Sequence, residues 1–123
     1  MKELMEQMRE WDGTAYPEML RKLPEIDIPV EGIRGWLLQG PASQAVFFDI
    51  SQGTVAPPHS HAAQWGIMVQ GEMELTIGGE TRTIRKGDWY YIPEGVMHSA
   101  TFSTRASVID IFDQASRYGT KNE

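Results

Sequence analysis

The sequence predicts an all-β domain, built either as a sandwich or as a closed barrel of short strands. From residue 26 onward, short stretches rich in β-branched and aromatic residues alternate with Gly, Pro and Asp turns. A two-residue loop, Gly78-Gly79, joins two alternating stretches, which is a strong hairpin signal. The length of 123 residues corresponds to one domain. Many short strands within one domain are typical of sandwiches and barrels.

The first part of the chain has a helical pattern instead. Residues 2–11 carry apolar side chains at helical spacing and predict a short helix, which Asp12-Gly13 ends. Residues 14–23 are ambiguous, because Pro17 is suited to open a second helical turn. We therefore expect a helical extension over residues 1–24 that covers the barrel.

The remaining elements follow from the positions of the turn residues. Strands are expected at residues 26–28, 33–39, 44–50, 54–57, 64–70, 72–77, 80–84, 88–92, 96–103 and 105–112. The barrel then spans residues 25–115. Residues 116–123 are polar, and we expect this tail to fray.

Composition excludes several classes of function. A net charge of −6 and a pI near 5.0 argue against nucleic-acid binding, because phosphates would be repelled. The sequence has no run of eighteen apolar residues for a membrane span and no apolar core of a secretory signal near its start. It contains no cysteine, which excludes disulfides and thiolate metal sites. A cytoplasmic location is the default expectation.

All three histidines fall into two short stretches. His59 and His61 lie in PPHSHAAQWGIMVQG, and His98 lies in GDWYYIPEGVMHSA. Residues two apart in a strand point the same way, so an extended segment aims His59 and His61 at one point. Imidazole is the commonest protein ligand for a divalent transition metal. The pattern predicts a metal site completed by one oxygen donor, with hydrogen-bonded histidines in a metal-free barrel as the alternative.

The spacing of the two stretches resembles the paired motifs of the cupin superfamily. The positions that carry the resemblance are Gly53, His59, His61, Gln64, Gly71, Gly87, Pro93, Gly95 and His98. The resemblance implies a cupin-type double-stranded β-helix, a jelly-roll barrel with a metal in its mouth. The usual first motif has Glu where this chain has Gln64, and its interval after the second histidine is longer. Gln64 is therefore either the fourth ligand or an amide that lines the pocket.

Period-two alternation outward from the ligands predicts which side chains face the pocket. Met68 shares a face with Gln64, Phe102 with His98, and Phe112 with Asp110, so these three are the candidate substrate-binding residues. Trp65, Ile67 and Val69 face the opposite way and need a cover, either the N-terminal helix or a second subunit. We expect a homodimer. The alternation does not decide whether Trp89 and Tyr91 or their neighbours face inward.

The last predicted strand carries an isolated carboxylate, Asp110. The run 106–112 is otherwise largely apolar, which predicts burial on both faces. A buried carboxylate costs several kcal/mol unless it is paired or hydrogen-bonded. Asp110 is therefore either held by Arg34, Arg105 or backbone amides, or is a general acid or base beside the metal.

The end of the chain also resembles a group of small cupins from uronate and pectin breakdown. Those proteins carry Asp, then Phe two residues later, then Arg, and they hold their metal with three His and one Gln. The matching positions here are Asp110, Phe112 and Arg117, although Arg117 comes one residue late. The resemblance implies that Asp110 and Arg117 are catalytic and that the substrate is an unsaturated uronate.

The predicted ligand set favours a small anionic ligand. Neutral imidazoles and a neutral amide leave the ion its full +2 charge, which polarises a bound carbonyl or carboxylate. We therefore expect proton transfer or ring opening on a sugar acid or keto acid. A metal-dependent dioxygenase and a non-catalytic metal- or sugar-binding module are the alternatives. The metal is one divalent transition ion, with Zn, Mn, Fe, Ni and Cu equally compatible.

Overall fold

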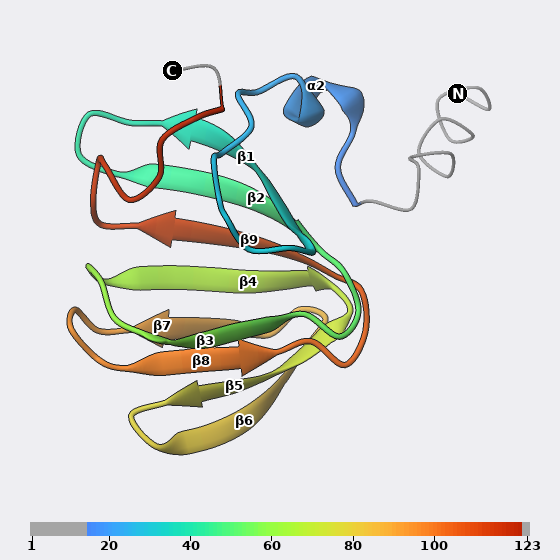
Figure 1. Cartoon of the computed structure of the whole chain (residues 1–123), viewed down its shortest axis with the longest axis vertical. Coiled ribbons are helices and arrows are strands. Elements are labelled where there is room, and N and C mark those ends of the chain that lie inside the picture. Colours follow the sequence, from blue (N-terminus) through green and yellow to red (C-terminus); the bar gives the residue numbers. More distant parts are fainter. Residues whose placement is uncertain (1–14, 122–123) are drawn as a thin grey trace.

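Two antiparallel β-sheets face each other in the computed structural model, which describes residues 15–121 (Figure 1). One sheet has the strand order β1-β2-β9-β4-β7 and the other the order β3-β8-β5-β6. The strands are β1 Ile33–Gln39, β2 Gln44–Ile50, β3 Val55–His59, β4 Gln64–Gln70, β5 Glu72–Ile77, β6 Glu80–Arg85, β7 Trp89–Ile92, β8 His98–Thr101 and β9 Ala106–Phe112. The predicted all-β jelly-roll fold is confirmed. The helix predicted at residues 2–11 lies outside the described residues.

Side chains along the strands alternate between the inside and the outside of the barrel, and the inward ones fill the space between the sheets. In β2, for example, Gln44, Val46, Phe48 and Ile50 are buried while the residues between them are partly exposed. Inward residues of β9, β4 and β5 meet this row to form one apolar core. The Gly78-Gly79 hairpin has the positive φ angles, 55° and 91°, that its two-residue loop demands.

The described segment before β1 contains one helical turn, at the place where Pro17 was suited to open one. Helix α2 spans Glu18–Arg21 and follows Pro17. The hydroxyl of Tyr16 lies 2.9 and 3.0 Å from carbonyl oxygens of β2 and β9, those of Phe48 and Val108. Edge-on ring contacts also join Tyr16 to two aromatic residues on the outer face of the five-stranded sheet. Tyr16 thereby fixes this segment on the end of the sheet that β1 and β2 form.

The C-terminal segment packs against the barrel, so the prediction that it frays from Ser116 is wrong as far as Lys121. Ile26 forms an isolated bridge with Thr120. The amide of Asp27 donates to Gly119 at 2.9 Å, and Lys121 donates to Glu25 at 3.0 Å. The strand predicted at 26–28 is also wrong, because the bridges there are isolated ones. Backbone pairing of this kind leaves no pattern of side chains in the sequence.

The outer face of the five-stranded sheet exposes apolar side chains on β9, β4 and β7. Trp89, Tyr91, Trp65 and Ile111 are 64%, 53%, 37% and 43% exposed, and strand register places Tyr91 and Ile111 on either side of Trp65. We call these four residues the outer apolar patch. The prediction that residues 106–112 are buried on both faces is therefore wrong at Ile111.

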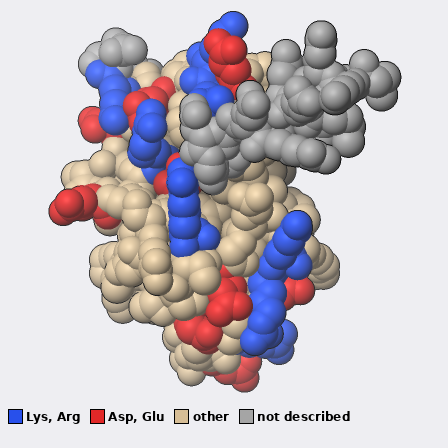
Figure 2. Space-filling view, turned by 90° about the vertical axis from the view of Figure 1, so that its right-hand side faces the viewer, with Lys and Arg blue, Asp and Glu red and all other residues tan. Residues whose placement is uncertain are grey.

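Charged side chains of both signs are interspersed elsewhere. Figure 2 shows lysine and arginine alternating with aspartate and glutamate on the side of the molecule that it draws. Several of them pair, including Arg34 with Glu25 and Arg105 with Asp49. The described surface in this view therefore has no continuous basic area of the kind that attracts nucleic acid. No helix between residues 15 and 121 is long and apolar enough to cross a membrane.

Candidate metal centre and pocket

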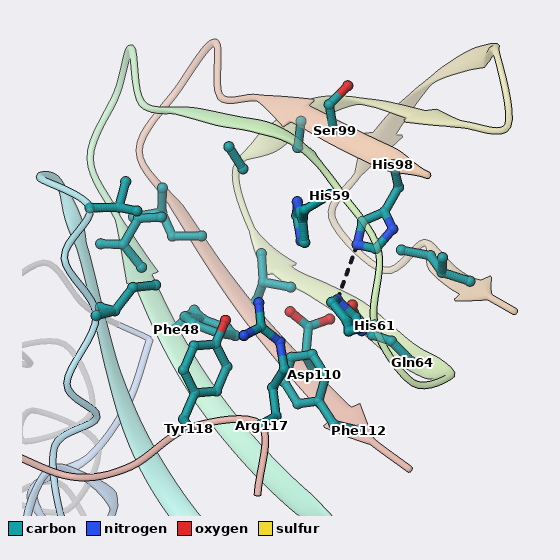
Figure 3. Close-up of a pocket in the computed structure, with 18 of the residues that line it drawn as sticks. Phe48, His59, His61, Gln64, His98, Ser99, Asp110, Phe112, Arg117 and Tyr118 are labelled. Carbon is teal, nitrogen blue, oxygen red and sulfur yellow. Dashed lines mark hydrogen bonds between the residues drawn. The ribbon is translucent and has the colours of Figure 1, made fainter. Parts of the chain in front are cut away.

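The three histidines converge at one end of the space between the sheets (Figure 3). His59 ends β3 and pairs across the sheet with His98, the first residue of β8, while His61 lies in the loop after β3. One ring nitrogen from each lies within 4.8 Å of those of the other two. The convergence predicted from their spacing is present.

A backbone carbonyl fixes the tautomer of each imidazole. The Nδ1 atoms lie 2.7 Å from the oxygen of Pro57, 2.7 Å from that of Ala62 and 2.9 Å from that of Val96. A carbonyl oxygen only accepts, so each Nδ1 carries the hydrogen. Each Nε2 then presents a lone pair, the state in which histidine binds a metal.

Two of these lone pairs face each other directly. The Nε2 atoms of His61 and His98 are 3.1 Å apart, a repulsive arrangement for two neutral imidazoles without a shared cation. Two nitrogens about 2.1 Å from one ion lie roughly 3.0 to 3.4 Å apart when neighbouring ligands subtend about 90 to 110°. The histidine cluster therefore fits a divalent metal.

The surroundings favour the neutral form of the His61 and His98 imidazoles. Burial lowers the pKa of His61 to about 4, a hydrogen bond to Ala62 opposes the shift, and the positive charge of Arg117 adds to it. Burial is also the main reason that the pKa of His98 is lowered. Neutral imidazole is the form that binds a metal, so at these two histidines a metal ion would meet little competition from protons at neutral pH.

Gln64 lies beside the cluster as the buried first residue of β4. Its side chain hydrogen-bonds the carboxylate of Asp110 and the hydroxyl of Tyr90. An ionised carboxylate only accepts, so the amide nitrogen of Gln64 donates to it. This contact leaves the amide oxygen of Gln64 for another partner. Ligation by Gln64 remains a prediction.

Asp110 forms no salt bridge with any residue between 15 and 121. It lies inside the barrel on β9, and the hydroxyl of Tyr90 donates to its Oδ1 at 2.5 Å. Arg34 pairs with Glu25 at 2.6 Å and Arg105 with Asp49 at 2.7 Å, so neither arginine holds Asp110. Burial raises the pKa of Asp110 to about 6, although the hydrogen bonds from Tyr90 and Gln64 oppose the shift.

A glycine makes room for this pair. Gly66 on β4 lies opposite Asp110 on β9 and opposite Tyr90 on β7. A Cβ atom at Gly66 would collide with the Asp110 carboxylate and the Tyr90 ring. The sequence did not decide that Tyr90 faces inward, but an inward glycine in a strand is a signal for such a close approach.

Arg117 brings a positive charge to the same pocket from the segment after β9. Its guanidinium carbon lies 4.5 Å from the ring centre of Tyr118 and 5.9 Å from that of Phe112. Figure 3 shows the guanidinium beside Asp110 and across the pocket from His98. Its Nε is buried and has no hydrogen-bond partner among residues 15–121. A buried, unpartnered donor of this kind is available to an anion.

The pocket itself has a volume of about 380 Å³. It is lined by all the residues predicted to bind metal or to be catalytic, and by two of the three predicted to bind substrate, Phe102 and Phe112. Met68 is only 1% exposed and lies in the apolar core, outside the pocket lining. Its predicted contact with substrate is therefore wrong. Met68 faces inward as expected, but at a depth that the alternation does not reveal.

Comparison with known proteins identifies the family. The family model of the cupin domain matches residues 46–112, which include both histidine stretches and Asp110. The chain is a cupin.

Solved structures agree with this assignment. KdgF from Halomonas sp. is 31% identical with a TM-score of 0.67, over 75% of this cupin and 88% of KdgF. An RmlC-like cupin from Shewanella frigidimarina is 24% identical with a TM-score of 0.72, over 85% and 93% of the two chains. Oxalate decarboxylase from Bacillus subtilis, described with Mn(II) centres, shares the fold at 20% identity and a TM-score of 0.67, over 85% of this cupin and 30% of the decarboxylase.

The curated relatives match this chain over only part of their length. Oxalate oxidase GF-3.8 from Triticum aestivum is 32% identical over an alignment of 80 residues that covers 55% of this cupin and 36% of the oxidase. An uncharacterized protein from Aquifex aeolicus is 33% identical over 54 residues, 42% of this cupin and 45% of that protein. The cupin therefore matches less than half the length of either relative.

One further residue of the site was not predicted. Gln44 is 1% exposed and opens β2. Its side-chain nitrogen donates to the carbonyl of Tyr118 at 2.9 Å, and its oxygen accepts from the Tyr118 amide at 3.0 Å. These two hydrogen bonds hold the backbone of Tyr118 and so position the neighbouring Arg117 in the pocket. A lone polar residue at a strand end looks like an exposed one in the sequence, so no signal distinguished Gln44.

Proposed function

We propose that this cupin is a metal-dependent enzyme that binds a small carboxylate and transfers a proton on it. The observation that supports this most directly is the joint placement of Asp110 and Arg117 in the pocket that the histidine cluster opens into. The pKa of Asp110 is raised to about 6, and Arg117 is a cation whose Nε has no hydrogen-bond partner within the described part of the chain. If Asp110 and Arg117 served only to stabilise the fold, we would expect them to form an ion pair with each other.

His59, His61, His98 and the amide oxygen of Gln64 would hold the divalent ion. When bound, this ion supplies a positive charge that polarises a carbonyl or carboxylate oxygen of the substrate. The four neutral donors leave that charge uncompensated, which favours an anionic substrate.

Arg117 binds the substrate carboxylate. Its guanidinium is held between aromatic rings and by the Gln44 contact to Tyr118, so little side-chain freedom is lost on binding. A guanidinium forms paired hydrogen bonds with a carboxylate, which orients the substrate as well as attracting it. The substrate then spans the space between Arg117 and the histidine cluster.

Asp110 is the general acid and base. A pKa of about 6 allows it both to take and to return a proton near neutral pH. Tyr90 and Gln64 hold one side of its carboxylate, so the group is oriented before substrate arrives. This chemistry corresponds to isomerisation, lyase or ring-opening reactions next to a carbonyl or carboxylate.

The similarity to KdgF and the resemblance of Asp110, Phe112 and Arg117 to cupins of uronate breakdown make unsaturated uronates one substrate candidate. Small 2-oxo acids are the other. Oxidation of a small acid is a second candidate function, favoured by the match to wheat oxalate oxidase. A non-catalytic module would bind the same acids without turnover.

The test is a turnover screen of metal-loaded protein with unsaturated uronates and small 2-oxo acids, with oxygen consumption recorded in parallel. We expect turnover without oxygen uptake. Asp110→Asn should abolish turnover while metal content and acid binding persist, and Arg117→Met should weaken acid binding. Full turnover by Asp110→Asn would contradict the role of Asp110, and stoichiometric oxygen uptake would favour the oxidase.

A further inference from the structure

The pocket has two chemically different parts, and we propose that its ligand is a carboxylate with an apolar body rather than a polyhydroxylated sugar acid. This inference rests on the function proposed above and specifies its substrate class. The polar groups gather at the histidine end, while the rest of the wall is largely hydrocarbon.

Strand register defines the polar end. Gln64 pairs with Phe112, and Gly66 with Asp110, in the first two inward layers of the five-stranded sheet. His59 pairs with His98 at the same end of the opposite sheet. Arg117 reaches this end from the following segment (Figure 3). These layers hold all the groups that the proposed function uses.

The next inward layers of both sheets are apolar. Val108 pairs with Phe48 on one side of β9, and Leu75 pairs with Ala100 in the opposite sheet. All four side chains line the pocket and belong to the apolar core. The deeper wall is completed by Ile50, Met73 and Phe102. A ligand that extends inward from the histidine cluster along this wall therefore meets hydrocarbon side chains.

The segment before β1 and the first residue of β1 supply a second apolar wall. The wall consists of Ile28, Val30 and Ile33, which are partly buried and line the pocket. Two further polar side chains line the pocket, those of Asp27 and Tyr118. They lie in or next to the segments 25–27 and 119–121, whose backbones pair beside this wall. The hydroxyl of Ser99 points away from the histidines (Figure 3).

The balance of these groups disfavours a uronate. Each sugar hydroxyl needs a hydrogen-bond partner, and burying one without a partner reduces affinity about five-fold or more. A methylene placed on the apolar wall instead increases affinity by up to about four-fold. The volume of about 380 Å³ lies near the lower end of the range for small-molecule pockets, which suits a short acid.

The experiment measures chain-length dependence by calorimetry on metal-loaded protein. The probes are straight-chain 2-oxo acids from pyruvate to 2-oxohexanoate, with galacturonate as the hydroxylated comparison. Affinity should rise about two- to four-fold per added methylene, and galacturonate should bind no more tightly than pyruvate. Ile33→Thr, which replaces an ethyl group by a hydroxyl, should reduce this dependence without weakening pyruvate. Ile109→Thr, on the outward side of β9, is the matched control and should leave it unchanged.

A flat dependence on chain length, or tighter binding of galacturonate, would overturn the apolar-body proposal and leave the proposed function standing. Failure of every acid to bind metal-loaded protein would overturn both. Arg117→Met separates the proposed function from the apolar-body proposal. It should lower the affinity for all the acids by a similar factor, while the dependence of affinity on chain length remains.

Discussion

Replacing Asp110 by Asn should stabilise the metal-free protein in a pH-dependent way. Burial raises the pKa of Asp110 in the folded protein from an ordinary value of 3.8 to about 6. Below pH 4 the carboxyl is protonated in both the folded and the unfolded chain, and it imposes no cost. As pH rises from 4 to 6, the unfolded chain releases this proton first, so the free energy of unfolding falls.

The size of the effect follows from the same values. Each pKa unit corresponds to about 1.4 kcal/mol, so ionising Asp110 above pH 6 costs the folded protein up to about 3 kcal/mol. An asparagine of nearly the same shape carries no such cost. Asp110→Asn should therefore match wild type near pH 3.5 and exceed its free energy of unfolding by up to about 3 kcal/mol at pH 8.

Urea unfolding followed by tryptophan fluorescence, in chelator-treated protein from pH 3.5 to 8, measures this difference. Asp113→Asn removes an exposed charge just past the same strand, and this control should change stability by less than about 0.5 kcal/mol. A constant difference between Asp110→Asn and wild type across this range would refute the argument. A less stable Asp110→Asn at pH 8 would refute it as well.

Three further predictions concern neighbouring features. Gln64→Leu should weaken metal binding about 10-fold or more in a chelator competition, whereas Gln64→Glu should retain the metal and weaken an anionic ligand; unchanged affinity in the leucine variant would exclude ligation. Gly66→Ala should lower the free energy of unfolding by about 1 to 3 kcal/mol, because its Cβ collides with Asp110 and Tyr90, and an unchanged urea midpoint would contradict that packing. Light scattering should show a homodimer that Trp89→Glu, in the outer apolar patch, converts to monomer; a wild-type monomer near 13.9 kDa would refute the dimer.

Local patterns in the sequence were sufficient for much of the fold. The positions of the turn residues predicted β1, β2, β4 and β5 with the bounds that the structure has. The paired segments 25–27 and 119–121 were not predicted, because their contacts join backbone groups.

The candidate site was predictable to the extent that its residues share a strand face. His59, His61 and His98 came from their spacing, and the inward direction of Asp110 from the period of its strand. Tyr90 was missed because β7 is aromatic and apolar on both faces, so alternation carries no information there. Gln44 was missed because its function is to bind another segment's backbone, which only the tertiary structure reveals.

The most direct test of the central claim is the metal content of protein purified without chelators. Elemental analysis of wild type should find about one divalent transition ion per chain. The double variant His59→Ala, His98→Ala should contain almost none while it keeps the circular dichroism spectrum of a β-protein. Equal metal content in the two proteins would contradict the assignment of the histidine cluster as the metal site.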